Sequence, residues 1–399
     1  MILHFVLRFV GPVVGLAVGV SGLAQAAPGS RPVVTLRRGT VKVYAAARRR
    51  APRRGIIGGR NVVFPLFAQV KAKGCRRPWM QIGPEAFVCS ARLRPGRGLP
   101  RATRYPRLRK GRLMPRSYFV TRRTVTVRTK PLATAPRVRT LREYSGIVAR
   151  GKVRTSSGVW RRTRSGYLPA SVMRFVRPSR LAGVHLGSKQ NLPISWISGA
   201  AAWATRRPVL SRKARVTRLK AYALVTVAEV RKVGRRRFSR VGPQRWVPSE
   251  RVRTARLRKP PKGVGLTQKW IHVSLKDWTL VAYVGVKPVF AALISRGYKT
   301  PKGRYRVTRK LAIATMRFNT RKGEYEAEAV PWVMYFKPRY AIHSAYWHDA
   351  FGSQASHGCV NLSPKDARWL FEWTAPGLPP GWFQIHQTPL SGGTHVIIE

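Results

Sequence analysis

The sequence predicts a mainly β protein built from several domains. Its 399 residues exceed the usual size of a single domain. Hydrophobic residues make up 44% of the chain, with 12 Trp and 13 Tyr, which is enough to form folded cores and argues against disorder. Short runs of alternating apolar and polar residues, separated by Gly and Pro, recur along the chain, and this alternation is typical of strands with one buried face.

The N-terminus predicts export. Residues 5–24 are largely apolar, and Ala24-Gln25-Ala26 is a small-residue cleavage pattern before Ala27-Pro28. We therefore expect residues 1–26 to be a signal peptide and the mature protein to act in the periplasm or cell wall. An uncleaved membrane anchor is the alternative. No cysteine follows the cleavage pattern, so a lipoprotein anchor is not supported.

Three segments, 34–98, 118–177 and 197–256, share one pattern. Each ends in an aromatic strand, a Gly- or Pro-marked turn and a further short strand, at residues 79–83 with 87–89, 159–163 with 166–169, and 238–241 with 246–248. The pattern resembles bacterial SH3-like modules, which implies three small β-barrels. Pro- and Arg-rich stretches at 99–117, 178–194 and 257–265 are expected to be linkers.

The three cysteines fit an exported protein. Cys75 and Cys89 lie in the first module, and an oxidising compartment favours a disulfide between them. The alternative is that both are reduced and buried. Cys359 is the cysteine that remains.

The charge of the chain is extreme. Its 79 Lys and Arg against 12 Asp and Glu give a net charge of +67. Only Glu85, Glu143, Glu229 and Glu250 precede the last third, so the N-terminal part is almost purely cationic. Such a field attracts polyanions, and the candidates are nucleic acid, anionic cell-envelope polymers and a lipid surface. Charge alone does not choose among them.

The last segment, 266–387, begins with alternation at 270–275 and 280–284, which predicts a hairpin. Ser363-Pro364-Lys365-Asp366 predicts the start of a helix, with a capping Ser, Pro in the first turn and an early acid. Apolar positions predict one helical face through Thr374, and Gly377 and two prolines end the helix. Residues 388–399 are expected to be a C-terminal tail.

A cysteine motif stands in this segment. Residues 356–361 read Ser-His-Gly-Cys-Val-Asn, and His343 lies sixteen positions before Cys359. A cysteine is nucleophilic as the thiolate, and a nearby imidazolium usually lowers the thiol pKa from about 8.5. Gly358 gives the loop backbone freedom and leaves amide groups available for a developing oxyanion.

This motif resembles the catalytic domain of L,D-transpeptidases (YkuD type), in which a His is followed after about a dozen residues by Ser/Thr-His-Gly-Cys-x-Asn. Here twelve residues separate His343 from Ser356. The stretches 294–297, 300–305 and 330–336 carry further similarity. The resemblance covers about residues 266–387 and implies a β-sandwich with one short helix.

The resemblance implies a role for each site residue. Cys359 is the expected nucleophile and His343 the base and then the acid, while His357, Gly358, Ser344, Ser356 and Asn361 are expected to shape the site and its oxyanion pocket. Ser344 stands where the family often has Gly, and its carbonyl can orient the imidazole. Candidates for the substrate groove are Trp332, Tyr335, Tyr346 and Trp347, for which core packing is the equal alternative. Asp349 is a further candidate for a third catalytic group.

Neither a metal nor an organic cofactor is expected. His343, His348, His357 and Cys359 could hold zinc in principle, but their spacing matches no helix-based zinc motif.

The implied reaction is acyl transfer between peptidoglycan stem peptides. The thiolate attacks the carbonyl of the third stem residue, a terminal D-alanine leaves, and an amine resolves the thioester. A second stem, a free D-amino acid, a lipoprotein lysine or water could accept the acyl group. The alternative is a non-catalytic basic protein that binds wall polyanions. Nucleic-acid binding has only the charge in its favour, so no nucleic-acid partner is expected. We expect the chemistry to be independent of the N-terminal modules.

Overall fold

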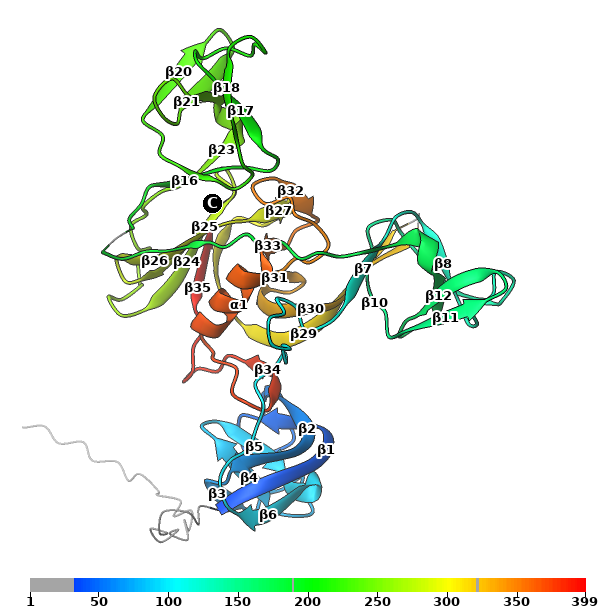
Figure 1. Cartoon of the computed structure of the whole chain (residues 1–399). Helices are drawn as coiled ribbons and strands as arrows, with labels where there is room; N and C mark the ends of the chain where they lie inside the picture. Colours follow the sequence, from blue (N-terminus) through cyan, green and yellow to red (C-terminus); the bar gives the residue numbers. More distant parts are fainter. Residues whose placement is uncertain (1–31, 189, 321–322) are drawn as a thin grey trace, which may run out of the picture.

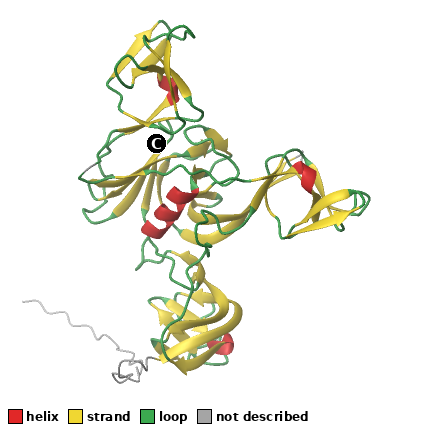
Figure 2. Cartoon of the chain, viewed as in Figure 1, coloured by secondary structure: helices red, strands yellow, loops and turns green. Residues whose placement is uncertain are grey.

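The computed structural model describes residues 32–188, 190–320 and 323–399. The predicted signal peptide lies outside these residues. The catalytic segment forms the centre, and three small β modules surround it (Figure 1). Strands dominate, and one α-helix lies at the centre (Figure 2). Within the described residues, none of the helices is long and apolar enough to cross a membrane.

The first module is a curled antiparallel sheet around a small apolar core. Its elements are β1 (Pro32–Tyr44), β2 (Arg53–Pro65), β3 (Ala68–Val70), β4 (Trp79–Gly83), β5 (Ala86–Cys89), η1 (Ser90–Arg92) and β6 (Leu93–Arg97). The long strands β1 and β2 pair with each other, and β1 also pairs with β6. Cys75 and Cys89 form a disulfide. Cys359 is the free cysteine among the described residues.

The second module repeats this plan with shorter strands. Its elements are β7 (Tyr118–Thr121), β8 (Val125–Arg128), β9 (Arg137–Leu141), β10 (Gly146–Val148), β11 (Gly151–Thr155), β12 (Gly158–Arg162), β13 (Tyr167–Pro169), η2 (Ala170–Val172) and β14 (Met173–Phe175). Its core contains Val127, Leu141, Ile147 and Leu168.

The third module follows the same plan. Its elements are β16 (Ile194–Ile197), β17 (Ala202–Thr205), β18 (Arg215–Leu219), β19 (Leu224–Val225), β20 (Glu229–Val233), β21 (Arg236–Arg240), β22 (Trp246–Pro248), η3 (Ser249–Arg251) and β23 (Val252–Ala255). In all three modules a 3-10 helix of three residues separates the last two strands. This shared ending is the structural counterpart of the repeated sequence pattern, and the assignment as SH3-like stays a prediction.

The central domain is a mainly β structure with two sheets and one helix. One sheet has the order β15 (Val184–His185), β26 (Lys287–Leu293), β25 (Thr279–Val284), β24 (Lys269–Ser274), β35 (His395–Ile398) and β28 (Gly303–Arg306). Pairings give the other the order β34 (Trp382–His386), β29 (Arg309–Thr320), β30 (Gly323–Lys337), β31 (Tyr340–Ser344), β33 (Val360–Leu362), β27 (Ser295–Gly297) and β32 (Gln354–Ser356). Their buried faces share one apolar cluster with the helix.

The helix α1 (Pro364–Trp373) begins where the sequence predicts. The Ser363 hydroxyl accepts a hydrogen bond from the Asp366 amide at 3.2 Å, and Pro364 occupies the first turn. Ala367, Leu370 and Phe371 are buried against the second sheet. At the other end the buried Lys310 donates from Nζ to the carbonyls of Phe371 and Thr374. These two hydrogen bonds satisfy carbonyls at the end of the helix, which lack partners within it.

Two expectations about boundaries are wrong. Residues 388–399 are not a tail, because β35 lies inside the first sheet, parallel to β24. The stretch 178–194 is not a free linker, because β15 pairs with β26 and the Gly183 amide donates to the buried Asp366 carboxylate at 2.6 Å. Apolar periodicity could not reveal either strand, because β15 has only two residues and β35 only four.

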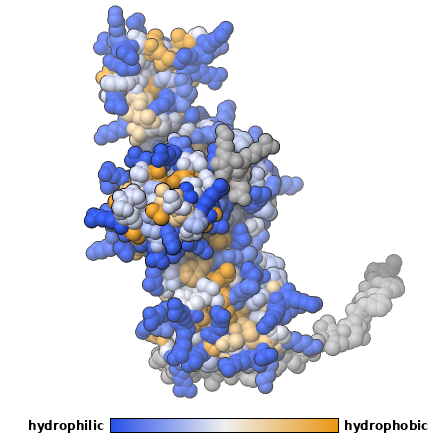
Figure 3. All heavy atoms as spheres, turned by 90° about the vertical axis from the view of Figure 1, so that its right-hand side faces the viewer, coloured by the Kyte–Doolittle hydropathy of each residue, from blue (hydrophilic) through white to orange (hydrophobic). Residues whose placement is uncertain are grey.

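The modules also contact the central domain directly. Strand β2 of the first module pairs with β34, and Met114, Tyr118, Val120 and Val176 belong to the same buried cluster as the central sheets. The surface seen in Figure 3 is mostly hydrophilic, in keeping with the excess of Lys and Arg. The modules are therefore packed extensions of the central domain.

Candidate active site

The strand register brings the predicted catalytic residues together. Strands β31 and β33 are parallel neighbours, and His343 pairs with Asn361. Cys359 directly precedes β33 and lies two residues before Asn361. The strand pairing thus brings two residues that are sixteen positions apart in sequence into the same region of one sheet.

His343 is held in one orientation. Its side chain is buried, and Nδ1 donates to the Ser344 carbonyl at 3.0 Å. This contact keeps the proton on Nδ1 and leaves Nε2 free to accept one. Burial lowers the pKa of His343 to about 4, and the Ser344 carbonyl opposes this shift. The imidazole is therefore neutral near pH 7.

Cys359 is also neutral at rest. Burial raises the pKa of its thiol to about 11, against a smaller opposing effect of a backbone hydrogen bond to Ala341. The sequence-based expectation of a thiolate lowered by an imidazolium is not met, because desolvation disfavours both charged forms. In the structure the thiol donates to the Arg339 carbonyl, with Sγ 3.9 Å from the oxygen.

Sequence reasoning missed the role of His348. Its Nδ1 accepts from the Ala350 amide at 3.2 Å, and its Nε2 lies 3.2 Å from the Ser295 hydroxyl and 3.1 Å from Asn361 Nδ2. Burial lowers its pKa to about 4. His348 therefore connects β27, β33 and the loop after β31. Its position five residues after His343 gave no indication of this, because the contact depends on the fold of that loop.

The catalytic loop needs a glycine on the neighbouring strand. A Cβ on Gly297 would lie 2.2 Å from the Gly358 nitrogen and 2.2 Å from the His357 carbonyl carbon. No other residue permits this approach without displacing the loop. The Gly358 amide, which the sequence suggested as an oxyanion donor, donates to the Ser356 hydroxyl at 3.2 Å.

His357 lies beneath the hairpin formed by β29 and β30. Its ring stacks on Phe318 with centroids 4.9 Å apart and contacts Tyr325 at 5.5 Å. Burial and the nearby cations Arg142 and Lys299 lower its pKa. The hairpin thus contacts His357, an exposed residue two positions before Cys359.

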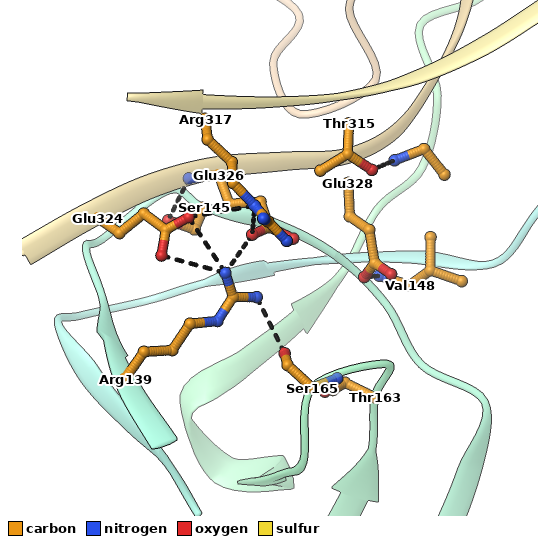
Figure 4. A network of polar contacts seen from close by, with 11 residues as sticks. Arg139, Ser145, Val148, Thr163, Ser165, Thr315, Arg317, Glu324, Glu326 and Glu328 are labelled. Atoms are coloured by element: carbon orange, nitrogen blue, oxygen red, sulfur yellow. Dashed lines mark hydrogen bonds and ion pairs between the residues drawn. The ribbon is translucent and has the colours of Figure 1, made fainter. Parts of the chain in front are cut away.

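The second module holds this hairpin (Figure 4). Arg139 Nη1 donates to both carboxylate oxygens of Glu324 at 3.1 Å and to Glu326, and Arg139 Nη2 donates to the Ser165 hydroxyl at 2.9 Å. From the hairpin itself, Arg317 Nε donates to Glu326 at 2.9 Å. Burial opposes protonation of Arg139, but the two carboxylates outweigh it and raise the pKa of the guanidinium.

Further contacts extend along the same strand. The Val148 amide donates to the Glu328 carboxylate at 2.8 Å, and the Tyr118 hydroxyl donates to the Ala329 carbonyl at 2.7 Å. Glu324, Glu326 and Glu328 are a quarter of the twelve acids in the chain. The second module is therefore bonded to β30 along much of its length.

Two of the four predicted groove residues belong to the core. Tyr346 is buried, stacks on Tyr118 and donates to the Glu328 carbonyl at 2.6 Å. Trp332 is buried and lines a separate cavity beside Leu108 and Phe371. Tyr335 and Trp347 lie nearer the site: Tyr335 pairs with Ala341, two residues before His343 on β31, and the Trp347 ring is 5.8 Å from the His343 ring.

The remaining candidates have other partners. Asp349 accepts a hydrogen bond from Tyr222 of the third module at 3.1 Å. In the part of the chain that the structure describes, no three His, Cys, Asp or Glu side chains gather into a metal-binding group.

The fold and the site define a class: a β domain in which β31 carries a buried histidine and the neighbouring strand β33 follows directly after a free cysteine. Residues 268–397 match the family described as YkuD, the L,D-transpeptidase catalytic domain. This part of the chain is an L,D-transpeptidase catalytic domain, of a family of cysteine transpeptidases. A search of curated proteins gave no match.

Solved structures of L,D-transpeptidases are similar to the chain. One from Enterococcus faecium is 23% identical, covering 33% of this chain and 50% of that one, with a TM-score of 0.27. The catalytic domain from E. faecium acylated by ertapenem is 23% identical over 34% of this chain and 99% of that one, with a TM-score of 0.26. L,D-transpeptidase 3 from Mycobacterium tuberculosis is 19% identical, covering 39% of this chain and 73% of that one, with a TM-score of 0.27. The chain thus spans about half the length of the first of these.

Proposed function

We propose that the protein is an exported peptidoglycan L,D-transpeptidase. The observation that supports the proposal is the pairing of β31, which carries the tautomer-fixed His343, with β33, which follows directly after Cys359, within an L,D-transpeptidase domain. The family acts on peptidoglycan stem peptides, and these are the proposed substrates.

The chemistry proceeds in two acyl transfers. The Cys359 thiol gives its proton to His343 Nε2 as sulfur attacks the carbonyl of the third stem residue. The carbon–nitrogen bond to the terminal D-alanine breaks, and His343 returns the proton to the leaving amine. An acceptor amine then attacks the thioester, giving a 3→3 crosslink, an exchanged D-amino acid or a protein attached through lysine, and the Cys359 thiol is restored.

The test is mass spectrometry of defined muropeptides incubated with the protein. We expect loss of D-alanine and formation of crosslinked or exchanged products, and Cys359→Ala abolishes both because the thioester cannot form. Products that persist in the alanine variant contradict the mechanism. A protein that binds sacculi but converts no muropeptide favours the alternative, a non-catalytic basic wall-binding protein.

A β-lactam offers a second test. The E. faecium domain described above was solved acylated by ertapenem. We expect one ertapenem adduct per chain by intact mass, and none in Cys359→Ser. An adduct retained in the serine variant places the acylation elsewhere.

A further inference from the structure

A cavity of about 1500 Å³ lies between the second module and the catalytic hairpin. Its walls come from three parts of the chain: the segment before β7, the second module with the segment that follows it, and strands β29 and β30. It shares no residue with the predicted catalytic set, which leaves its role unassigned.

Arginine dominates the charge of this cavity. Seven guanidinium groups line it, together with a single carboxylate, that of Glu328. Arg109, Arg112 and Arg116 come from the segment before β7, Arg150 and Arg164 from the second module, and Arg177 and Arg180 from the segment after it. All seven are exposed, and no lysine lines the cavity.

The carboxylates near the cavity already have hydrogen-bond or ion-pair partners. Glu324 and Glu326 bind Arg139 and Arg317, and Glu328 accepts from the Val148 amide. Within the described residues, none of the seven cavity arginines makes a salt bridge, so the protein leaves this group of charges uncompensated. Like charges gathered in a concave wall create a strong local positive potential, which recruits anions from solution.

One wall of the cavity leads toward the predicted site. Tyr335 lines the cavity and pairs with Ala341, which lies two residues before His343 on β31. Arginine is the side chain best suited to planar carboxylate and tetrahedral phosphate groups, because its donors form a fork.

We propose that this cavity binds a peptide that carries repeated carboxylate groups and holds it along the strand that leads to the predicted site. The proposal rests on the proposed function in one respect: the bound peptide belongs to the stems of the wall on which Cys359 acts. A phosphate-bearing polymer is the competing ligand that the test distinguishes.

The test compares two variants of equal charge. Arg112→Gln/Arg150→Gln/Arg180→Gln removes three cavity cations, and Arg235→Gln/Arg236→Gln/Arg237→Gln removes three exposed cations from the β20–β21 turn of the third module. Both are made in the full chain with Cys359→Ser, so binding is measured without turnover. Fluorescence anisotropy follows labelled oligoglutamate and labelled oligo(glycerol phosphate) separately, at about 0.15 M salt to limit long-range attraction.

We expect the cavity variant to lose about tenfold in affinity for oligoglutamate and the control less than about twofold. A loss confined to oligo(glycerol phosphate) would assign the cavity to a phosphate-bearing polymer and overturn the proposal. Equal losses of affinity in both variants would show that binding depends on the net charge of the chain. Unchanged affinity in the cavity variant would exclude the cavity as the binding site. Either result overturns the proposal. Because the assay needs no catalysis, cavity-specific binding by a protein that converts no muropeptide separates the two proposals.

Discussion

At the scale of single residues, the neutral state of His343 and Cys359 determines how the site responds to pH. Burial lowers the first pKa to about 4 and raises the second to about 11. His343 accepts a proton only when neutral, so the rate of ertapenem acylation should be constant from about pH 5 to 8 and fall as pH approaches 4. The thiolate absorbance of Cys359, measured as wild type minus Cys359→Ser, should appear only well above pH 8. Thiolate absorbance at pH 6 would contradict this and show that Cys359 and His343 form an ion pair in the resting protein.

Lys310 gives a prediction about stability. Burial lowers its pKa from 10.5 to about 7, so between these values the unfolded chain binds more protons than the folded one. The free energy of unfolding therefore gains a rising contribution from about pH 7 to 10. Lys310→Met should remove this contribution, and chemical denaturation of both proteins across that range measures it. The exposed Lys287 on β26, changed to Met, is the control. A parallel pH dependence of wild type and Lys310→Met would show that Lys310 does not titrate in this range.

The sequence predicts Cys359 and His343 as the site because their spacing is local and chemically unusual. It could not find Lys310, since a lysine in an alternating strand is expected to face solvent. It placed Trp332 and Tyr346 in the groove because an aromatic side chain fits core and groove equally. Their burial depends on Leu108 and Tyr118, which belong to segments more than two hundred positions earlier.

At the scale of elements, the β29–β30 hairpin joins the catalytic loop to the second module. Arg139→Gln removes the second module's cation from the buried Glu326 and leaves Arg317, on the hairpin itself, as its remaining ion-pair partner among the described residues, which is costly. We expect the hairpin amides to exchange hydrogen faster and ertapenem acylation to slow about tenfold, equal to ~1.4 kcal/mol in the barrier. Both changes should be smaller in Arg139→Lys, which keeps the positive charge but loses the forked arrangement of guanidinium donors.

Arg137→Gln is the matched control for this prediction. Arg137 lies two residues away on the same strand, β9, and is exposed. Faster hairpin exchange with an unchanged acylation rate would show that the second module stabilises the hairpin without positioning the catalytic loop.

The elements themselves were largely predictable. The opening hairpin of the central domain and the boundaries of α1 follow from alternation and from the Ser363-Pro364 start. Strands β15 and β35 were not predictable, because two or four residues give too little periodicity and their pairing partners are distant in sequence.

At the scale of the whole molecule, the packing changes the expectation that residues 266–399 react independently. Met114, Tyr118, Val120 and Val176 fill part of the central apolar cluster, and the fragment lacks them. We expect the fragment to lose ~2–5 kcal/mol of unfolding free energy, by analogy with large-to-small changes in a core, and to acylate more slowly than the full chain. Denaturant titration and acylation rates of both proteins test this. Equal stability would show that the modules are spacers.

The strand pairings between modules and central domain have one more consequence. Strand β2 covers the β34 side of one sheet, and β15 covers the β26 side of the other. An uncovered strand edge presents free amides and carbonyls to which another chain can add, which is how sheets aggregate. A catalytic domain separated from its modules would carry two such edges, so its solubility, like its shape, is provided by residues that lie far from its chemistry.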